Sequence, residues 1–413
     1  MPPQLHAVLG ASSAKRWLTC TPSARLGERL TSRFGSESSP YAQEGTKAHA
    51  LAEIKVRKAY YAADGMTTAV YSRMSEEERD AYTGINAFRY DALRAELGDI
   101  PSDMEHATDA YCDVVMEKYL SAKDRDPSTR LLLEQRLDYS AWVPSGFGTG
   151  DCVIVSDSLL EVCDYKHGMG IPVDAVDNPQ LRLYGLGAIA KFGQLYDFPA
   201  VRMTIIQPRL ESVSEETLDR EALLAWAEAE VREKAQLAWK GIGDFVPGDH
   251  CRFCPAKAVC SARVAEALKL FRYGFETPGL IPDEQVPGIL ETLDTAEAWI
   301  KDFRAYAEKQ ALNGQKFPGW KLVRGKKPNR RWADPEEVRA QLLRAGYAPG
   351  QIETTLLKPV GEIEKAIGAK AFRALVGGLV AQGEGRLTLV PESDKRLEYA
   401  SADAAFADLI SND

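Results

Sequence analysis

The sequence predicts an α/β fold in which a small mixed sheet is flanked by helices. Helix-like periodicity fills the chain up to about residue 121, and short apolar runs bounded by turn residues follow between residues 130 and 207. Apolar residues make up 45% of the chain and charged residues 27%, which is the balance of a globular protein.

The expected helices of the first part begin at residues 12–31, where Ser12 is a good cap and Trp17 and Leu26 supply an apolar face. Further helices are expected over 43–62, 75–98 and 103–121. Together these predict a helical start, with a helical insert at about 65–125.

The expected sheet begins with a strand at residues 130–138. Residues 144–150 hold three glycines and predict a turn, and 151–155 with 159–166 predict a β-hairpin around a polar tip. The remaining core elements expected are a helix over 178–192, a strand over 201–207 and a long helix over 215–240. The predicted core order is therefore helix, three strands, helix, strand.

Two regions are expected. Residues 1–270 form the core domain with its insert, and residues 271–413 form a mainly helical accessory region with a helix near 283–312. No apolar run is long enough to span a bilayer, and the first ten residues lack the pattern of a signal peptide. We therefore expect a cytoplasmic protein without a membrane partner.

Asp151, Asp164 and Lys166 form the central chemical pattern of the sequence. Residues 164 and 166 share one face of a strand because side chains alternate, and the hairpin partner can bring Asp151 beside them. Aspartates suit Mg²⁺ or Mn²⁺, which can generate hydroxide and polarise a phosphate, and a nearby lysine can stabilise the developing charge. An isolated pattern of this kind is better explained by a surface hairpin with ordinary charges.

Further polar residues strengthen this pattern. His49 lies near the start of a helix, where it could ligate a metal or simply be a buried hydrogen-bonded histidine, and Glu53 lies one turn later. Gln180 and Tyr184 share one face of the helix after the hairpin, where they could contact the site or make a helix–helix polar contact.

Cysteines give the second signal. Cys251, Cys254 and Cys260 form a tight cluster, and Cys20 lies far upstream as a possible fourth ligand. Four thiolates suit either zinc or a 4Fe-4S cluster, and His250 could replace Cys20 in a local zinc site. The other three cysteines, which are expected to be small core residues, are Cys112, Cys152 and Cys163.

The combination of GTxxH, GTGD, DYK and QxxxY with this cysteine pattern resembles the RecB-like branch of the PD-(D/E)XK nucleases. It resembles more narrowly the iron–sulfur members, such as the CRISPR-associated RecB-like exonucleases and AddB nuclease domains. Phrases such as SSAKRWLTC at 12–20, NPQ at 178–180, QPR at 207–209 and PESDKR at 391–396 resemble a family encoded by phages and prophages. No proline precedes Asp151, as is usual for this branch.

The resemblance implies a PD-(D/E)XK core with an iron–sulfur staple and assigns roles to individual residues. The metal ligands would be His49, Asp151, Asp164 and the Tyr165 carbonyl, and the catalytic lysine would be Lys166. Gln180 and Tyr184 would be the QxxxY pair, and Glu134 would be a further acidic position. The cluster ligands would be Cys20, Cys251, Cys254 and Cys260.

The implied activity is metal-dependent DNA hydrolysis, more exonuclease than site-specific endonuclease, on single strands or duplex ends. The implied partners are DNA and a phage recombination or replication protein. The rival interpretation is a non-catalytic scaffold, derived from a nuclease, that binds DNA or protein. The net charge of −9 argues against a passive DNA-coating protein but not against a nuclease. Six basic residues between Trp320 and Trp332 could bind DNA or form a solvated surface.

Overall fold

The computed structural model describes residues 7–34, 40–63, 94–270 and 282–320, together with positions 344, 365 and 369. The chain divides into two compact units, Met1–Leu322 and Val323–Asp413. The expected helix at 75–98 lies mostly outside the described residues, and so do the basic stretch beyond Trp320 and the phrase at 391–396. The domain boundary expected at residue 270 stays a prediction.

A five-stranded mixed sheet forms the centre of the first unit, in the order β1-β2-β3-β4-β5. Neighbouring strands are antiparallel except β3 and β4, which are parallel. The expected α/β class and the expected β2–β3 hairpin are therefore confirmed. The strands are β1 (Arg130–Asp138), β2 (Phe147–Val155), β3 (Leu160–Tyr165), β4 (Ala200–Gln207) and β5 (Ser212–Asp219).

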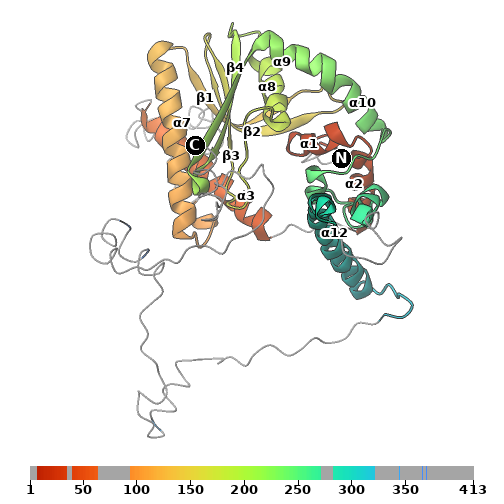
Figure 1. The fold of residues 1–413 in the computed structure, drawn as a ribbon. Coiled ribbons are helices and arrows are strands. Elements are labelled where there is room, and N and C mark those ends of the chain that lie inside the picture. The colour runs from red at the N-terminus through yellow and green to blue at the C-terminus, as the bar shows by residue number, and fades with distance from the viewer. Residues whose placement is uncertain are drawn as a thin grey trace, which may run out of the picture. The chain divides into compact units, whose positions relative to one another are not determined.

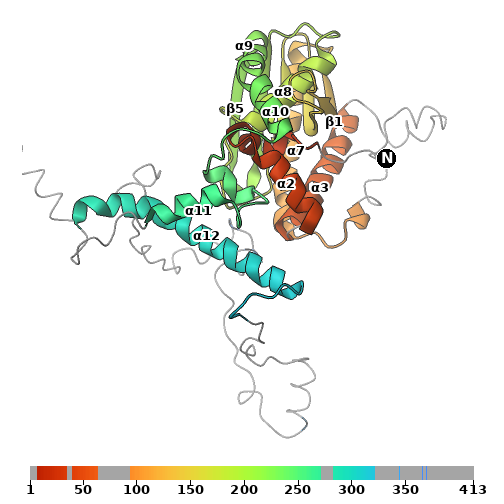
Figure 2. The ribbon, with the colours of Figure 1, turned by 90° about the vertical axis from the view of Figure 1, so that its right-hand side faces the viewer.

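Helices cover both faces of this sheet (Figures 1 and 2). One layer is made by α3 and α7, and the other has α8 at its centre. The α-helices are α1 (Ala14–Thr19), α2 (Ser23–Phe34), α3 (Pro40–Ala63), α7 (Ser102–Arg125), α8 (Pro179–Phe192), α9 (Arg220–Trp226), α10 (Arg232–Lys240), α11 (Ser261–Leu268) and α12 (Val286–Leu312). The short helices are η1 (Ala11–Ser13), η3 (Pro208–Leu210), the π-helical η4 (Ala227–Val231), η5 (Asp249–Phe253) and η7 (Asp283–Gln285).

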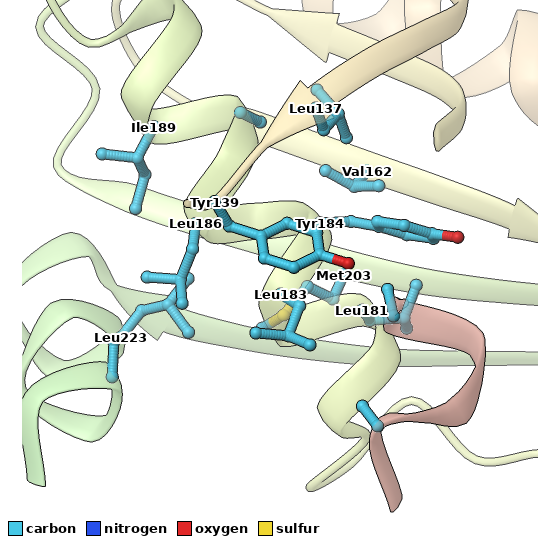
Figure 3. Packing of buried hydrophobic residues seen from close by; sticks show 14 of the residues in the cluster. Leu137, Tyr139, Val162, Leu181, Leu183, Tyr184, Leu186, Ile189, Met203 and Leu223 are labelled. Atoms are coloured by element: carbon cyan, nitrogen blue, oxygen red, sulfur yellow. The ribbon is translucent and has the colours of Figure 1, made fainter. Parts of the chain in front are cut away.

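Each face of the sheet has its own apolar core. The face toward α8 is continued by side chains of α1, α9 and α10, and part of it is drawn in Figure 3. The face toward α3 and α7 includes Cys152 and Cys163, which lie opposite each other across β2 and β3. Both thiols are fully buried, so the expectation that they are core residues is confirmed.

The α8 helix connects the two parallel strands, as a parallel pair requires. Asn178 caps it by accepting a hydrogen bond from the Gln180 N–H, and Pro179 stands at the first helical position, where its missing N–H costs nothing. This cap fixes Gln180 in the first turn of the helix. Across all described residues, no helix combines the length and apolarity needed to cross a membrane.

The helix expected over 215–240 is wrong in its first part. Residues up to Asp219 form the edge strand β5, whose side chains alternate between half-buried and exposed, and the helix begins only at Arg220. The polar composition of this strand hides its period of two. Pairing with β4 along its whole length decides its conformation.

The single helix expected over 12–31 is also wrong, because the structure has a break after Thr19. Pro22 restricts the backbone before it and has no N–H to donate to a continuing helix. Arg16 bridges the break by donating a hydrogen bond to the Ser23 carbonyl over 2.9 Å. Cys20 therefore lies in a fixed bend between α1 and α2 instead of inside a helix.

Candidate functional site

The end of β3 carries two residues expected at the site, Asp164 and Lys166. Lys166 continues the strand pairing, since its N–H donates to the Ile206 carbonyl over 2.9 Å. Its ammonium Nζ lies 2.8 Å from Asp164 Oδ2, and the Asp164 side chain is only 4% exposed. The alternation expected from the sequence thus places both groups on one face.

Asp151, on the neighbouring strand β2, links the hairpin to α3. Its Oδ2 accepts a hydrogen bond of 2.8 Å from the Tyr165 backbone N–H, and its Oδ1 lies 3.3 Å from His49 Nδ1. The structure therefore brings Asp151, Asp164, Lys166 and His49 together, although their chemical roles stay predictions.

His49 lies on α3, and its ring faces the Asp151 carboxylate. Burial opposes the charged ring, but the adjacent Asp151 carboxylate outweighs burial and raises the pKa of His49. The ring also meets Tyr165 edge to face, with ring centres 5.2 Å apart. Glu53, which was expected to support His49, instead pairs with Arg57 at 2.7 Å.

Gln180 contacts both Asp164 and Lys166 through its side-chain amide. Its Nε2 donates to Asp164 Oδ1 over 3.0 Å, and its Oε1 accepts from Lys166 Nζ over 3.2 Å. The Tyr184 hydroxyl lies 3.4 Å from the same Nε2, one helical turn further along α8. The amide orientation is thereby fixed by both of its ends.

Glycines before Asp151 make room for this arrangement. They were expected to form a turn, but β2 begins at Phe147, and Gly148 and Gly150 therefore lie inside a strand. A β-carbon on Gly148 would lie 2.7 Å from Tyr184 Cε1, and one on Gly150 would lie 2.8 Å from Leu137 Cδ1. These two strand glycines thus lie where the side chains of Tyr184 and Leu137 leave no room for a β-carbon. They do not mark a turn of the chain.

Glu134, on β1, lies at the register position between two pairs, Leu133 with Cys152 and Gln135 with Gly150. That position is opposite Asp151. Its backbone has a φ of 51°, which is rare for a residue other than glycine. Partial burial, together with the charges of Asp151 and Glu53, raises the pKa of Glu134 to about 7.

The unusual backbone at Glu134 also changes which way β1 faces. Leu133 packs toward α3 and α7, whereas Leu137, four positions later, packs toward α8. Regular alternation would place both on the same face. A residue of strained backbone opposite the site carboxylate of Asp151 is typical of a functional site.

Asp164 has one carboxylate oxygen with a notable environment. Oδ2 is buried, and the Lys166 ammonium, with its Nζ 2.8 Å away, forms an ion pair with it outside ordinary hydrogen-bond geometry. Burial raises the pKa of Asp164; Lys166 opposes this rise and Asp151 reinforces it. A divalent cation would offset the repulsion between the two carboxylates.

Sequence reasoning missed a polar cluster beside these residues. His167 was given no role, yet its side chain is 5% exposed and lies between the Tyr165 hydroxyl at 2.8 Å and Glu44 Oε1 at 3.2 Å. Arg209 donates to Glu44 over 3.0 Å and to Asp103 over 2.8 Å. The available signal was the position of His167 directly after Lys166.

The four cysteines expected to bind a cluster line one small cavity together with His250. Cys20 reaches it from the bend after α1, and Cys251, Cys254 and Cys260 reach it from the loop around η5. Thr21 Oγ1 donates to the Ile242 carbonyl over 2.6 Å, which ties the two segments together.

Electrostatics differ among these thiols. Burial opposes ionisation of Cys20, but hydrogen bonds with His250 and with the Val246 and Ser23 backbone outweigh burial and lower its pKa. Burial raises the pKa of Cys254, and the nearby thiols of Cys251 and Cys20 raise it further. Cys112 lies elsewhere on α7, where burial raises its pKa to about 11.

Neither constellation is closed around an ion. Within the ranges that the structure describes, no three histidine, cysteine, aspartate or glutamate side chains are gathered so that they could hold a metal ion as they stand.

Comparison with known proteins identifies one family. A family model described as "Protein of unknown function (DUF2800)" matches residues 6–397. A solved structure described as "Crystal structure of SSO0001" is 14% identical, covers 51% of this chain and 85% of its own, and superposes with a TM-score of 0.19.

Proposed function

The chain belongs to the DUF2800 family, and we propose that it is a metal-dependent nuclease that hydrolyses phosphodiester bonds in DNA. One observation carries this proposal most strongly. Asp151, Asp164 and Lys166 meet at the end of β3, where the buried Asp164 carboxylate pairs with Lys166 at 2.8 Å and Asp151 accepts a hydrogen bond from the Tyr165 N–H.

The donor set at this place fits Mg²⁺ or Mn²⁺. His49, Asp151 and Asp164 would hold the ion, with the Tyr165 carbonyl as a further oxygen ligand, as the resemblance to RecB-like nucleases implies. A bound ion would supply Lewis-acid activation of the phosphate and a hydroxide at neutral pH.

The remaining side chains have roles that follow from their contacts. Lys166, charged and beside Asp164, is placed to stabilise negative charge on the phosphate oxygens. Gln180 keeps Lys166 and Asp164 in fixed relation, because its amide bonds to both. Tyr184 supports Gln180 from the next turn of α8.

We propose in addition that the four cysteines hold a 4Fe-4S cluster, with zinc as the alternative. Their shared cavity supports a common ligand, and the lowered pKa of Cys20 favours the thiolate that ligates metals. Such a group would staple the start of the chain to the end of the core domain.

The family resemblance supports the finer details of the proposal. The resemblance to RecB-like nucleases favours exonuclease action on single strands or duplex ends, in phage or prophage DNA processing or recombination. The lack of a signal-peptide pattern in the first ten residues favours the cytoplasm as the place of action.

The test uses the full chain with DNA labelled at the 5′ or the 3′ end, single- or double-stranded, with Mg²⁺, Mn²⁺ or EDTA. We expect cleavage that needs the metal and disappears in Asp164→Asn. Asp113→Asn, which changes an exposed carboxylate of α7, is the matched control and should cleave normally. Binding without cleavage under every metal condition would replace the proposal with the non-catalytic scaffold.

A further inference from the structure

We infer that Glu44, His167, Arg209 and Asp103 form a latch that docks α3 against the end of β3 and thereby positions His49 and Asp151. This inference rests on the proposed function, because it concerns the same metal-binding residues. The four latch residues are positioning residues, because they act on His49 and Asp151 through Tyr165.

The latch joins four segments that are far apart in the chain. His167 follows β3, and its two ring nitrogens face the Tyr165 hydroxyl and the Glu44 carboxylate of α3. Arg209, from η3, lies 3.2 Å from His167 Nε2 and donates to Glu44 and to Asp103 of α7. One guanidinium and one imidazole thus connect α3 and α7 to the segments that follow the parallel strands β3 and β4.

Tyr165 transmits this arrangement to the site. Its hydroxyl contacts His167, its ring packs edge to face on His49, and its backbone N–H holds Asp151. A shift of the Tyr165 ring would therefore change the position of one proposed ligand directly and the orientation of another through the backbone.

Stability alone does not account for the latch. Glu44 and Asp103 are 39% and 48% exposed, and ion pairs of such exposure contribute little to folding. His167 in contrast is buried directly after Lys166, with both ring nitrogens in contact with polar partners. A buried histidine held in this way fixes geometry more than it adds stability.

The experiment measures Mn²⁺ alone, by electron paramagnetic resonance titration of the full chain. Loss of partners that orient metal ligands costs about tenfold to hundredfold in metal affinity, and we expect such a loss for His167→Ala. Tyr165→Phe removes only the hydroxyl and should lose affinity in the same direction while it keeps the fold. In cleavage assays both variants should lower kcat and leave KM for DNA unchanged, because a positioning role acts on the proposed metal ligands and not on DNA binding.

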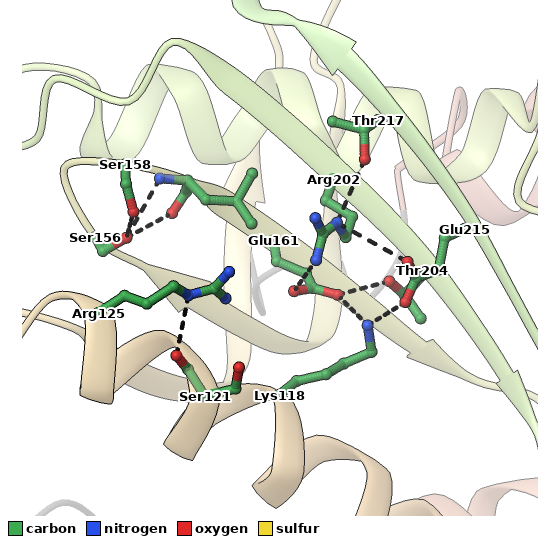
Figure 4. A network of polar contacts seen from close by, with 11 residues as sticks. Lys118, Ser121, Arg125, Ser156, Ser158, Glu161, Arg202, Thr204, Glu215 and Thr217 are labelled. Atoms are coloured by element: carbon green, nitrogen blue, oxygen red, sulfur yellow. Dashed lines mark hydrogen bonds and ion pairs between the residues drawn. The ribbon is translucent and has the colours of Figure 1, made fainter.

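The matched control lies at the other end of the same sheet. Lys118 of α7 contacts Glu161 of β3 over 2.8 Å and also contacts Glu215, in a network of comparable burial (Figure 4). Lys118→Gln should lower thermal stability and leave Mn²⁺ affinity unchanged.

Two results would overturn the inference in different ways. Wild-type affinity in both His167→Ala and Tyr165→Phe would refute the latch and leave the proposed metal site standing; Tyr165→Phe decides alone if His167→Ala does not fold. Absence of Mn²⁺ binding by the wild type would refute the proposed metal site and the latch with it.

Discussion

Gly148→Ala tests the account of why glycine precedes the site aspartate. The added methyl would lie 2.7 Å from Tyr184 Cε1, whereas ordinary carbon contacts begin at 3.4 Å. The Tyr184 ring must therefore move by about 0.7 Å, or the strand must bend by the same amount.

The magnitude follows from what surrounds the ring. Tyr184 is 6% exposed and belongs to the core cluster on α8, so it has little space to move into. Overpacking of such a position costs about 1 to 3 kcal/mol of unfolding free energy. The displaced hydroxyl would also leave Gln180, which orients Asp164 and Lys166, and we therefore expect cleavage to fall by more than the loss of stability explains.

The assay compares urea unfolding and cleavage for Gly148→Ala and a control glycine. Gly45 in α3 has open space around it, and Gly45→Ala should gain up to about 1 kcal/mol because alanine is the better helix former. If Gly148→Ala unfolds at the same urea concentration as the wild type and cleaves normally, the steric account of this glycine is refuted.

Further predictions concern the proposed catalytic lysine, the cysteines and an acid of raised pKa. Lys166→Ala should abolish metal-dependent DNA cleavage while circular dichroism stays native; full activity would contradict the assigned role. Cys20→Ala should lose iron and unfold at lower temperature, whereas Cys112→Ala should lose neither; one zinc retained in Cys20→Ala would favour the local His250 zinc site instead. Because the pKa of Glu134 is raised from 4.5 to about 7, the folded state keeps a proton that the unfolded state releases. The wild type should therefore lose stability as pH rises through that interval, and Glu134→Gln should show a flatter slope in urea midpoints; identical slopes would count against the raised pKa.

Strands with a clear period of two were predictable from the sequence. The bounds of β1 match the expectation, and the hairpin of β2 and β3 places Asp151, Asp164 and Lys166 together as expected. These positions depend on local alternation and on one short turn, both of which a single sequence contains.

Elements decided by distant contacts were not predictable. β5 contains glutamates and threonine that suit a helix start as well as an edge strand, and pairing with β4 determines the outcome. The rotated backbone at Glu134 likewise has no local sequence cause. It breaks the alternation on which face assignment from sequence depends.

His167 shows the same limit for the site. A histidine after a strand carries no sign of its surroundings, and its partners Glu44 and Arg209 lie 123 and 42 positions away. Only the packing of α3 and η3 against the strand end brings these charges together.

The packing of α1 and α2 against α10 affects how the chain folds while the ribosome synthesises it. Arg25 donates to the Trp239 carbonyl, and these two residues are 214 positions apart. At roughly 5 to 20 residues per second, the helices at the start wait about 10 to 40 seconds before their docking surface exists. Trp17, fully buried in the finished protein, has no such burial during that interval. The nascent chain therefore exposes the apolar segment around Trp17 during this interval. We expect chaperones that bind emerging polypeptides to recognise that segment.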